Sequence, residues 1–379
     1  MKKILINALF LLGATSLFAQ GTPPGAKKVQ VAILFDTSNS MDGLIDQAKS
    51  RIWNIVNEVS SLRYSGTAPT IEFAIYEYGN DRLESSDNFI KQVLDLSTDL
   101  DEISQKLFAL STNGGSEYCG AVIQESLDDL NWSNDPSDLK MIYIAGNESF
   151  DQGSVSYKKA CTNAKAKNIY INSIFCGDYQ QGINLLWKDG ANCSEGDYFN
   201  IDSDKEIAHI DTPYDTKIQM YNDSLNQTYY GYGSLGRDKK NLQISEDANA
   251  SGQSGSVATE RAMAKSKKGV YRNSSWDLVD AVDNGKELSE LTDEELPEEF
   301  KGKSLEEKQA LLNEAKENRE SYQKKIAELA IEREKFIVDE RKKMAEAGAE
   351  IDDFGTKINE SIIERAEING FEKEVVTPK

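Results

Sequence analysis

The stretch Ile33–Asp42, ILFDTSNSMD, decides the fold, because an apolar run ends abruptly in one carboxylate and three hydroxyls. The apolar, β-branched residues Val29–Phe35 predict a buried strand. Asp36, Ser38 and Ser40 alternate, so in an extended segment their side chains point the same way. All three present oxygen, the ligand atom that hard divalent cations prefer. The end of this strand is therefore a candidate metal site.

Further strand-like runs alternate with helical patterns along the first half of the chain. Strands are predicted at 70–79, 89–97, 139–148, 169–178 and 196–202, and helices at 45–62, 99–110 and 157–168. This alternation predicts an α/β fold over residues 29–209, with a doubly wound, mainly parallel sheet. Ligands of such sheets gather at the carboxyl ends of the strands, near the switch point in strand order. Asp36 and Glu148 are both expected at that edge.

The charge balance restricts the class of partner. The chain has 379 residues, 43 basic and 64 acidic, with a formal net charge of -21. Nucleic-acid phosphates would be repelled by such a surface, so a general nucleic-acid-binding role is excluded. The acidity suits cations, basic partners or simple solubility.

The N-terminus has the form of a secretory signal peptide. In residues 1–19, MKKILINALFLLGATSLFA, two lysines precede an apolar run. An uncleaved anchor is the alternative, but the run is short for a full membrane span, so we expect cleavage near Ala19 or Gln20. Residues 20–28 are a Pro/Gly linker. The mature protein is therefore expected to be extracytoplasmic: periplasmic, on the cell surface or secreted.

Four cysteines remain: Cys119, Cys161, Cys176 and Cys193. Export permits disulfides, and four thiols allow three complete pairings, among which the sequence does not choose. A CxxC pair is lacking, which disfavours a zinc cluster. His209 is the only histidine and cannot form a multi-histidine metal site; we expect a packed or surface residue.

The second half of the chain is less regular. Residues 210–285 read as a polar extension and 286–303 as an acidic linker. Ser304 and Glu307 then fit a capping box that opens a helical region at 304–374. Two arginines, Arg319 and Arg333, occupy positions of the apolar seam and interrupt it. A long coiled coil is therefore disfavoured, and a helical hairpin is expected, packed on itself or on the α/β domain.

Three loops together resemble a known family. They contain Asp36-x-Ser38-x-Ser40, then Gly114-Gly115-Ser116 before a predicted helix, then Ala145-Gly146-Asn147 after the fourth strand. This arrangement resembles the von Willebrand factor A-type (vWA) domain of secreted bacterial proteins, with its metal-ion-dependent adhesion site (MIDAS), over roughly residues 29–209. A DxSxS motif by itself is a weak signal, but its place after a buried strand and before the Gly-Gly-hydroxyl loop makes it specific.

The resemblance implies a set of metal ligands and a partner. Asp36, Ser38, Ser40 and Ser116 would supply oxygen ligands to Mg²⁺ or Mn²⁺, some of them through water. Thr112 is the alternative hydroxyl to Ser116. The hydroxyls carry no charge, so the ion stays electrophilic, and an open position would accept a carboxylate from a protein partner.

One departure from the family pattern bears on the metal. The family's third loop usually reads T-D-G, and here Gly146 takes the place of the aspartate. Glu148, two residues later, is the candidate that would reach the ion or a bound water. Losing a negative ligand leaves three alternatives, of which the first two are a more electrophilic ion and weaker metal binding. A degenerate site that keeps the loop geometry without an ion is the third.

Three functions remain open on this basis. The first is a non-enzymatic binding protein, acting through the cation in adhesion or envelope assembly. The second is a metal-independent envelope scaffold. The third is a phosphatase of the haloacid dehalogenase type, which would need a second aspartate where Ser38 stands. The fold alone does not fix the function. The first function is preferred because the oxygen-bearing side chains at the end of the first strand point to a bound cation.

Overall fold

The computed structural model describes residues 27–42, 44–201, 210–348 and 354–374. The predicted signal peptide, most of the 20–28 linker and His209 lie outside these residues. Among the described helices, none is both long enough and apolar enough to span a bilayer.

Six strands form one sheet in the order β4-β3-β1-β5-β6-β7, in which only the edge strand β4 is antiparallel to its neighbour. Their bounds are β1 Lys28–Asp36, β3 Thr70–Tyr78, β4 Ile90–Ser97, β5 Leu139–Gly146, β6 Tyr170–Cys176 and β7 Tyr198–Ile201. The chain runs from β1 to β3 on one side and later crosses to β5 on the other, so β1 and β5 flank the switch point. The predicted doubly wound, mainly parallel sheet is confirmed. A separate antiparallel pair joins β2 (Leu62–Arg63) to β8 (Glu372–Lys373).

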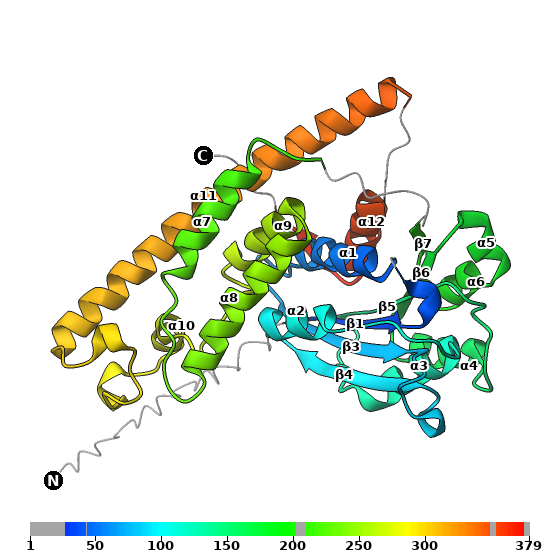
Figure 1. Cartoon of the computed structure of the whole chain (residues 1–379), viewed down its shortest axis with the longest axis horizontal. Coiled ribbons are helices and arrows are strands. Elements are labelled where there is room, and N and C mark those ends of the chain that lie inside the picture. The colour runs from blue at the N-terminus through cyan, green and yellow to red at the C-terminus, as the bar shows by residue number, and fades with distance from the viewer. Residues whose placement is uncertain (1–26, 43, 202–209, 349–353, 375–379) are drawn as a thin grey trace, which may run out of the picture.

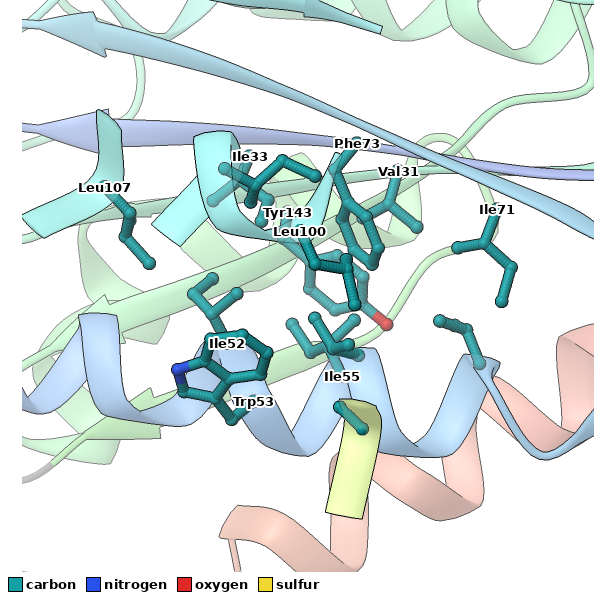
Figure 2. Close-up of a cluster of buried hydrophobic side chains, with 14 of the residues drawn as sticks. Val31, Ile33, Ile52, Trp53, Ile55, Ile71, Phe73, Leu100, Leu107 and Tyr143 are labelled. Carbon is teal, nitrogen blue, oxygen red and sulfur yellow. The ribbon is translucent and has the colours of Figure 1, made fainter. Parts of the chain in front are cut away.

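Helices cover both faces of the sheet (Figure 1). One face carries α1 (Leu44–Val59), α2 (Leu100–Phe108) and α12 (Phe354–Ile368). The other carries α3 (Cys119–Asp129), α4 (Tyr157–Ala166), α5 (Tyr179–Asn184) and α6 (Trp187–Asn192). Successive side chains of a strand point to opposite faces. Accordingly, Val31 and Ile33 pack with Ile52 and Ile55 of α1 (Figure 2), whereas Leu34 belongs to the core on the α3 side.

The predicted polar extension at 210–285 is helical. It contains α7 (Asp215–Asn226), α8 (Gly236–Gln253), α9 (Gly255–Ser266) and α10 (Leu278–Asp283). The Ser/Asn/Gly-rich run that ends α8 gives no apolar periodicity, yet it stays helical because buried Ala250 packs into the core. Only Ser254 separates α8 from α9, and its side chain accepts a hydrogen bond from the Val257 amide and caps α9.

The C-terminal region consists of two helices that pack on different partners. Ser304 and Glu307 form the predicted capping box of α11 (Leu305–Glu346). Figure 1 shows α11 as one long helix beside α7, and it also contacts α9. The following α12 lies instead against α1 and β7 of the α/β domain. The region therefore differs from a hairpin packed on itself, and only α12 takes the place expected on the α/β domain.

The two arginines that interrupt the apolar seam of α11 attach this helix to the extension at 210–285. Arg319 Nη1 lies 2.8 Å from Asp277 Oδ2 and 2.8 Å from Asp280 Oδ1, and its guanidinium stacks 3.9 Å from the ring centroid of Tyr229. Arg333 Nε lies 2.8 Å from Asp215 Oδ1. Both arginines are buried. A buried guanidinium is tolerated where carboxylates pair with it, so these positions join α11 to the extension.

Residues 286–303 differ from the predicted acidic linker. They include two short 3₁₀ turns, η3 (Leu288–Glu290) and η4 (Glu298–Phe300). Their four buried apolar side chains, those of Leu288, Leu291, Leu296 and Phe300, form a small core with α10 and α11. The acidic composition hid this apolar spacing, since the carboxylates face solvent around it.

The cysteine pairing that the sequence left open is resolved by the geometry. Cys161 of α4 and Cys193, just after α6, form a disulfide. Cys119 and Cys176 are free and buried. The disulfide joins two helices on the α3–α4 face of the sheet.

Candidate metal centre

Asp36 ends β1 with its side chain fully buried. Its Oδ1 accepts a hydrogen bond of 2.8 Å from the Ser38 amide, whereas Oδ2 is buried and has no partner among the described residues. Burial raises the pKa of Asp36 to about 7, hydrogen bonds from Ser38 oppose the shift, and the carboxylates of Glu117 and Glu148 add to it. Either a proton or a bound cation is therefore needed to neutralise the buried Asp36 carboxylate.

The two serines of the motif connect the first loop to the third. Ser38 Oγ and Ser40 Oγ lie 2.8 Å apart. Ser40 Oγ donates to Asn147 Oδ1 at 2.8 Å, and Asn147 Nδ2 donates back to the Ser40 carbonyl at 3.0 Å. Asn147 follows β5, so this pair of hydrogen bonds joins the loops on both sides of the switch point.

The second loop lies against the end of β3, beside Asp36. A β-carbon on Gly115 would lie 2.1 Å from the Gly79 carbonyl oxygen, so only glycine permits this approach. Ser116 is half-buried and stands between Gly115 and Glu117. The alternative hydroxyl, Thr112, donates instead to the carboxylate of Asp42. Of the two hydroxyls, that of Thr112 is thus engaged by Asp42, and Ser116 stays the candidate ligand of this loop.

Glu117 is a candidate ligand that the sequence did not select. Asp36 Oδ1 and Glu117 Cγ each lie 2.9 Å from the point that a β-carbon of Gly79 would occupy, and Gly79 has a positive φ of 74°. Glu117 is 7% exposed. Burial raises its pKa, a hydrogen bond with Ser38 opposes this, and neighbouring Glu148 and Asp81 raise it further. Its sole sequence signal is its place directly after Gly-Gly-Ser.

The third loop has no room for the missing aspartate. A β-carbon on Gly146 would lie 2.6 Å from the Tyr78 hydroxyl, 3.0 Å from the Trp187 ring and 3.1 Å from Asp36 Cβ. Any side chain at 146 therefore requires neighbours to move. The side chain that reaches the first loop is that of Asn147, one residue later, which the sequence also did not select.

Glu148 stands at the exposed rim of the site. Its backbone carbonyl accepts a hydrogen bond of 2.7 Å from Trp187 Nε1, and the side chain of Trp187 is fully buried. The buried indole thereby fixes the backbone of the loop. The Glu148 carboxylate lies close enough to raise the pKa of both Asp36 and Glu117.

No family model and no curated protein matches the chain. Solved structures similar to it include BatB from Bacteroides thetaiotaomicron, with 15% identity over 46% of this chain and 90% of that one, and a TM-score of 0.36. The SpRpn10 VWA domain has 14% identity over 47% and 90% of the two chains, and a TM-score of 0.36. Proximal thread matrix protein 1 from the mussel byssus, with a zinc-occupied MIDAS motif, has 15% identity over 48% and 43%, and a TM-score of 0.35.

The strand order, the antiparallel edge strand and the DxSxS loop at the end of the central strand decide the fold. Residues 28–201 have the fold of a vWA domain. Within this vWA domain, the three predicted loops meet at the carboxyl edge of the sheet. Hydrogen bonds connect Asp36 to Ser38, Ser38 to Ser40 and Ser40 to Asn147 of the third loop, and Ser116 lies in the adjoining loop.

The donor set of the vWA domain fits a hard cation. Among the described residues, no three Asp, Glu, Cys or His side chains are grouped to hold a metal ion by themselves, so hydroxyl oxygens have to complete any such site. The buried, unpartnered Asp36 Oδ2 supplies an anionic ligand, and Ser38 and Ser40 supply neutral ones. Mg²⁺ and Mn²⁺ accept such mixed oxygen ligands together with waters.

Proposed function

We propose that the vWA domain binds a divalent cation, Mg²⁺ or Mn²⁺, and through it a protein partner. Asp36, Ser38 and Ser40 would hold the ion, with Ser116 and Glu148 at the rim. The observation that carries the proposal is the Asp36 carboxylate, buried with one oxygen unpartnered among the described residues. A buried carboxylate without a compensating charge is costly, and a bound cation removes that cost.

Glu117 would act in place of the aspartate that position 146 cannot hold. Its side chain approaches Asp36 from the second loop, beside Gly79. It carries the negative charge that the third loop lacks, so the site keeps two buried carboxylates. This favours a site that binds a cation, because without one the two carboxyl groups could avoid burying two negative charges only by holding protons.

A bound cation would supply positive charge that attracts a carboxylate from the partner. The chain's own residues support binding rather than phosphoryl transfer. Ser38 stands where a phosphatase needs a second carboxylate, and its hydroxyl is hydrogen-bonded to the hydroxyl of Ser40. The preferred role is therefore adhesion or envelope assembly by an extracytoplasmic, non-enzymatic protein. The helices α7 to α12 would hold the vWA domain at a fixed orientation.

Isothermal titration calorimetry of the full chain with MgCl₂ and MnCl₂ tests this proposal. Wild-type protein is expected to bind one ion, and Asp36→Asn is expected to abolish the heat while keeping the fold by circular dichroism. Asp42→Asn is the matched control, because Asp42 follows the motif and its carboxylate accepts a hydrogen bond from Thr112 rather than from a residue of the motif. Absence of both heat and thermal shift with either metal would support the metal-independent scaffold instead.

A further inference from the structure

A pocket lies beside the metal centre on the vWA domain. It has a volume of about 430 Å³ and is formed by the end of β3, the turn after it, β4 and the C-terminal end of α2. In Figure 1, α2 lies over β3 and β4, and α2 contacts both strands. The metal centre and this pocket thus occupy the same end of β3.

The charged side chains of the pocket are mainly basic, whereas the protein as a whole is acidic. Arg82, Lys91 and Lys106 line it, with Glu77 as the sole acidic side chain. Lys91 Nζ pairs with Glu77 Oε1 at 3.2 Å. Arg82 Nη1 donates to the Ser111 hydroxyl at 3.3 Å, and within the described part of the chain neither Arg82 nor Lys106 has a carboxylate partner. Two such cations are notable in a chain of 64 acidic and 43 basic residues.

Apolar side chains line the rest of this pocket. Leu83, Val93 and Leu110 come from the turn, β4 and the end of α2. Leu110 is 7% exposed and belongs to the domain core, so this part of the lining is held in place by packing. An occupant that matches both features has a carboxylate and an apolar side chain close together, as an acidic peptide segment does.

The pocket and the metal centre share a wall. Asn80 Nδ2 donates to the Ser111 carbonyl at 3.0 Å and to the Thr37 carbonyl at 3.3 Å. Thr37 lies between Asp36 and Ser38 of the motif, and Ser111 immediately precedes the second loop. One buried side chain therefore connects the lining of the pocket to the loop that would hold the cation.

We propose that this pocket binds an acidic and apolar segment of the same protein partner whose carboxylate completes the metal site. The inference rests on the proposed function. The cation would take one carboxylate of the partner, and Arg82 and Lys106 would take a second, beside an apolar side chain. Two points of attachment would then fix the direction in which the partner chain lies across the domain.

A phage-displayed library of random dodecapeptides, selected on the full chain in Mg²⁺ and eluted with a chelator, tests the inference. Wild-type protein is expected to select peptides with two separated acidic positions, the second next to an apolar residue. The double variant Arg82→Glu/Lys106→Glu is expected to keep one acidic position and to lose or reverse the second. For the best peptide, binding to the double variant should fall at least tenfold by fluorescence anisotropy.

Lys159→Glu provides the matched control, because Lys159 is exposed on α4, on the opposite face of the sheet. It is expected to leave the selected sequences and the affinity unchanged, and thermal melts should show that all variants fold. If the double variant selects the same two-acid peptides, the pocket proposal is overturned while the metal proposal stands. If wild-type protein selects no chelator-sensitive peptide, the proposed function fails and the pocket proposal fails with it.

Discussion

The side chains of Asp36 and Glu117 meet beside Gly79, where Asp36 Oδ1 and Glu117 Cγ each lie 2.9 Å from the point that a β-carbon would occupy, and neither carboxylate has a basic partner among the described residues. Asp36 comes from the end of the central strand and Glu117 from the loop before α3. Two buried carboxylates in one place raise each other's pKa unless a cation lies between them. This pair gives the proposed site its charge and leads to the first prediction.

Without metal, Asp36 makes the stability of the protein fall as pH rises. Its pKa is about 7 in the folded protein against an ordinary value of 3.8, so the folded state holds the proton more tightly between these values. The stabilisation is complete below pH 4 and is lost as pH rises through 7, by up to about 4 kcal/mol. Urea unfolding in a chelator should show this loss in wild type and a flatter pH profile in Asp36→Asn.

Mg²⁺ should offset the same loss. The cation competes with the proton for Asp36, so the expected rise in melting temperature is larger at pH 8 than at pH 5.5. Differential scanning calorimetry at both pH values measures it. An equal rise at both, or a rise that persists in Asp36→Asn, would place the ion elsewhere.

Gly146→Ala should destabilise the vWA domain. The added β-carbon meets the Tyr78 hydroxyl at 2.6 Å and Asp36 Cβ at 3.1 Å, so the strands must shift, at about 1–3 kcal/mol. Gly252→Ala is the control, since nothing lies within 4 Å of its β-carbon in α8 and alanine favours the helix by up to about 1 kcal/mol. Urea unfolding should give opposite signs for the two variants; equal signs would show that position 146 has more room than described.

Arg319→Leu should cost about 3–5 kcal/mol, because it leaves the fully buried Asp277 without its charge partner. Lys324→Leu on the exposed side of α11 removes a weak pair with Glu328 and should change stability by less than about 1 kcal/mol. Chemical denaturation of both variants compares them. Similar small effects would mean that Arg319 does not hold α11 in place.

Non-reducing peptide mapping should recover Cys161 linked to Cys193, with Cys119 and Cys176 as thiols. The bond closes a loop with a sequence separation of 32 residues, for which chain entropy gives about 3–4 kcal/mol of stabilisation. Cys161→Ser/Cys193→Ser should therefore unfold at lower urea concentration than wild type. Any other pairing in the map contradicts the described geometry.

The sequence predicted the sheet well because its strands are continuous apolar runs that end at polar residues, as between Phe35 and Asp36. It predicted the packing of the helical half poorly for two reasons. Arg319 and Arg333 look like interruptions of a seam until their buried partners Asp277 and Asp215 are known. The apolar side chains of 286–303 are spaced among carboxylates, so composition alone suggested a linker.

The candidate site was predictable in part for similar reasons. The DxSxS loop carries a local pattern, so Asp36, Ser38 and Ser40 could be selected from the sequence. Glu117 and Asn147 could not, since their proximity to Asp36 and Ser40 depends on how β3 and β5 lie beside β1. The lack of room at Gly146 is likewise a property of the packed strands.

The most direct test is an anomalous difference map from crystals of the full chain soaked in MnCl₂. The proposed metal centre should give one manganese peak within coordination distance of Asp36, flanked by Ser38 and Ser40, with Glu117 directed towards it. A map with only water at this position, in crystals where manganese binds elsewhere or not at all, would contradict it.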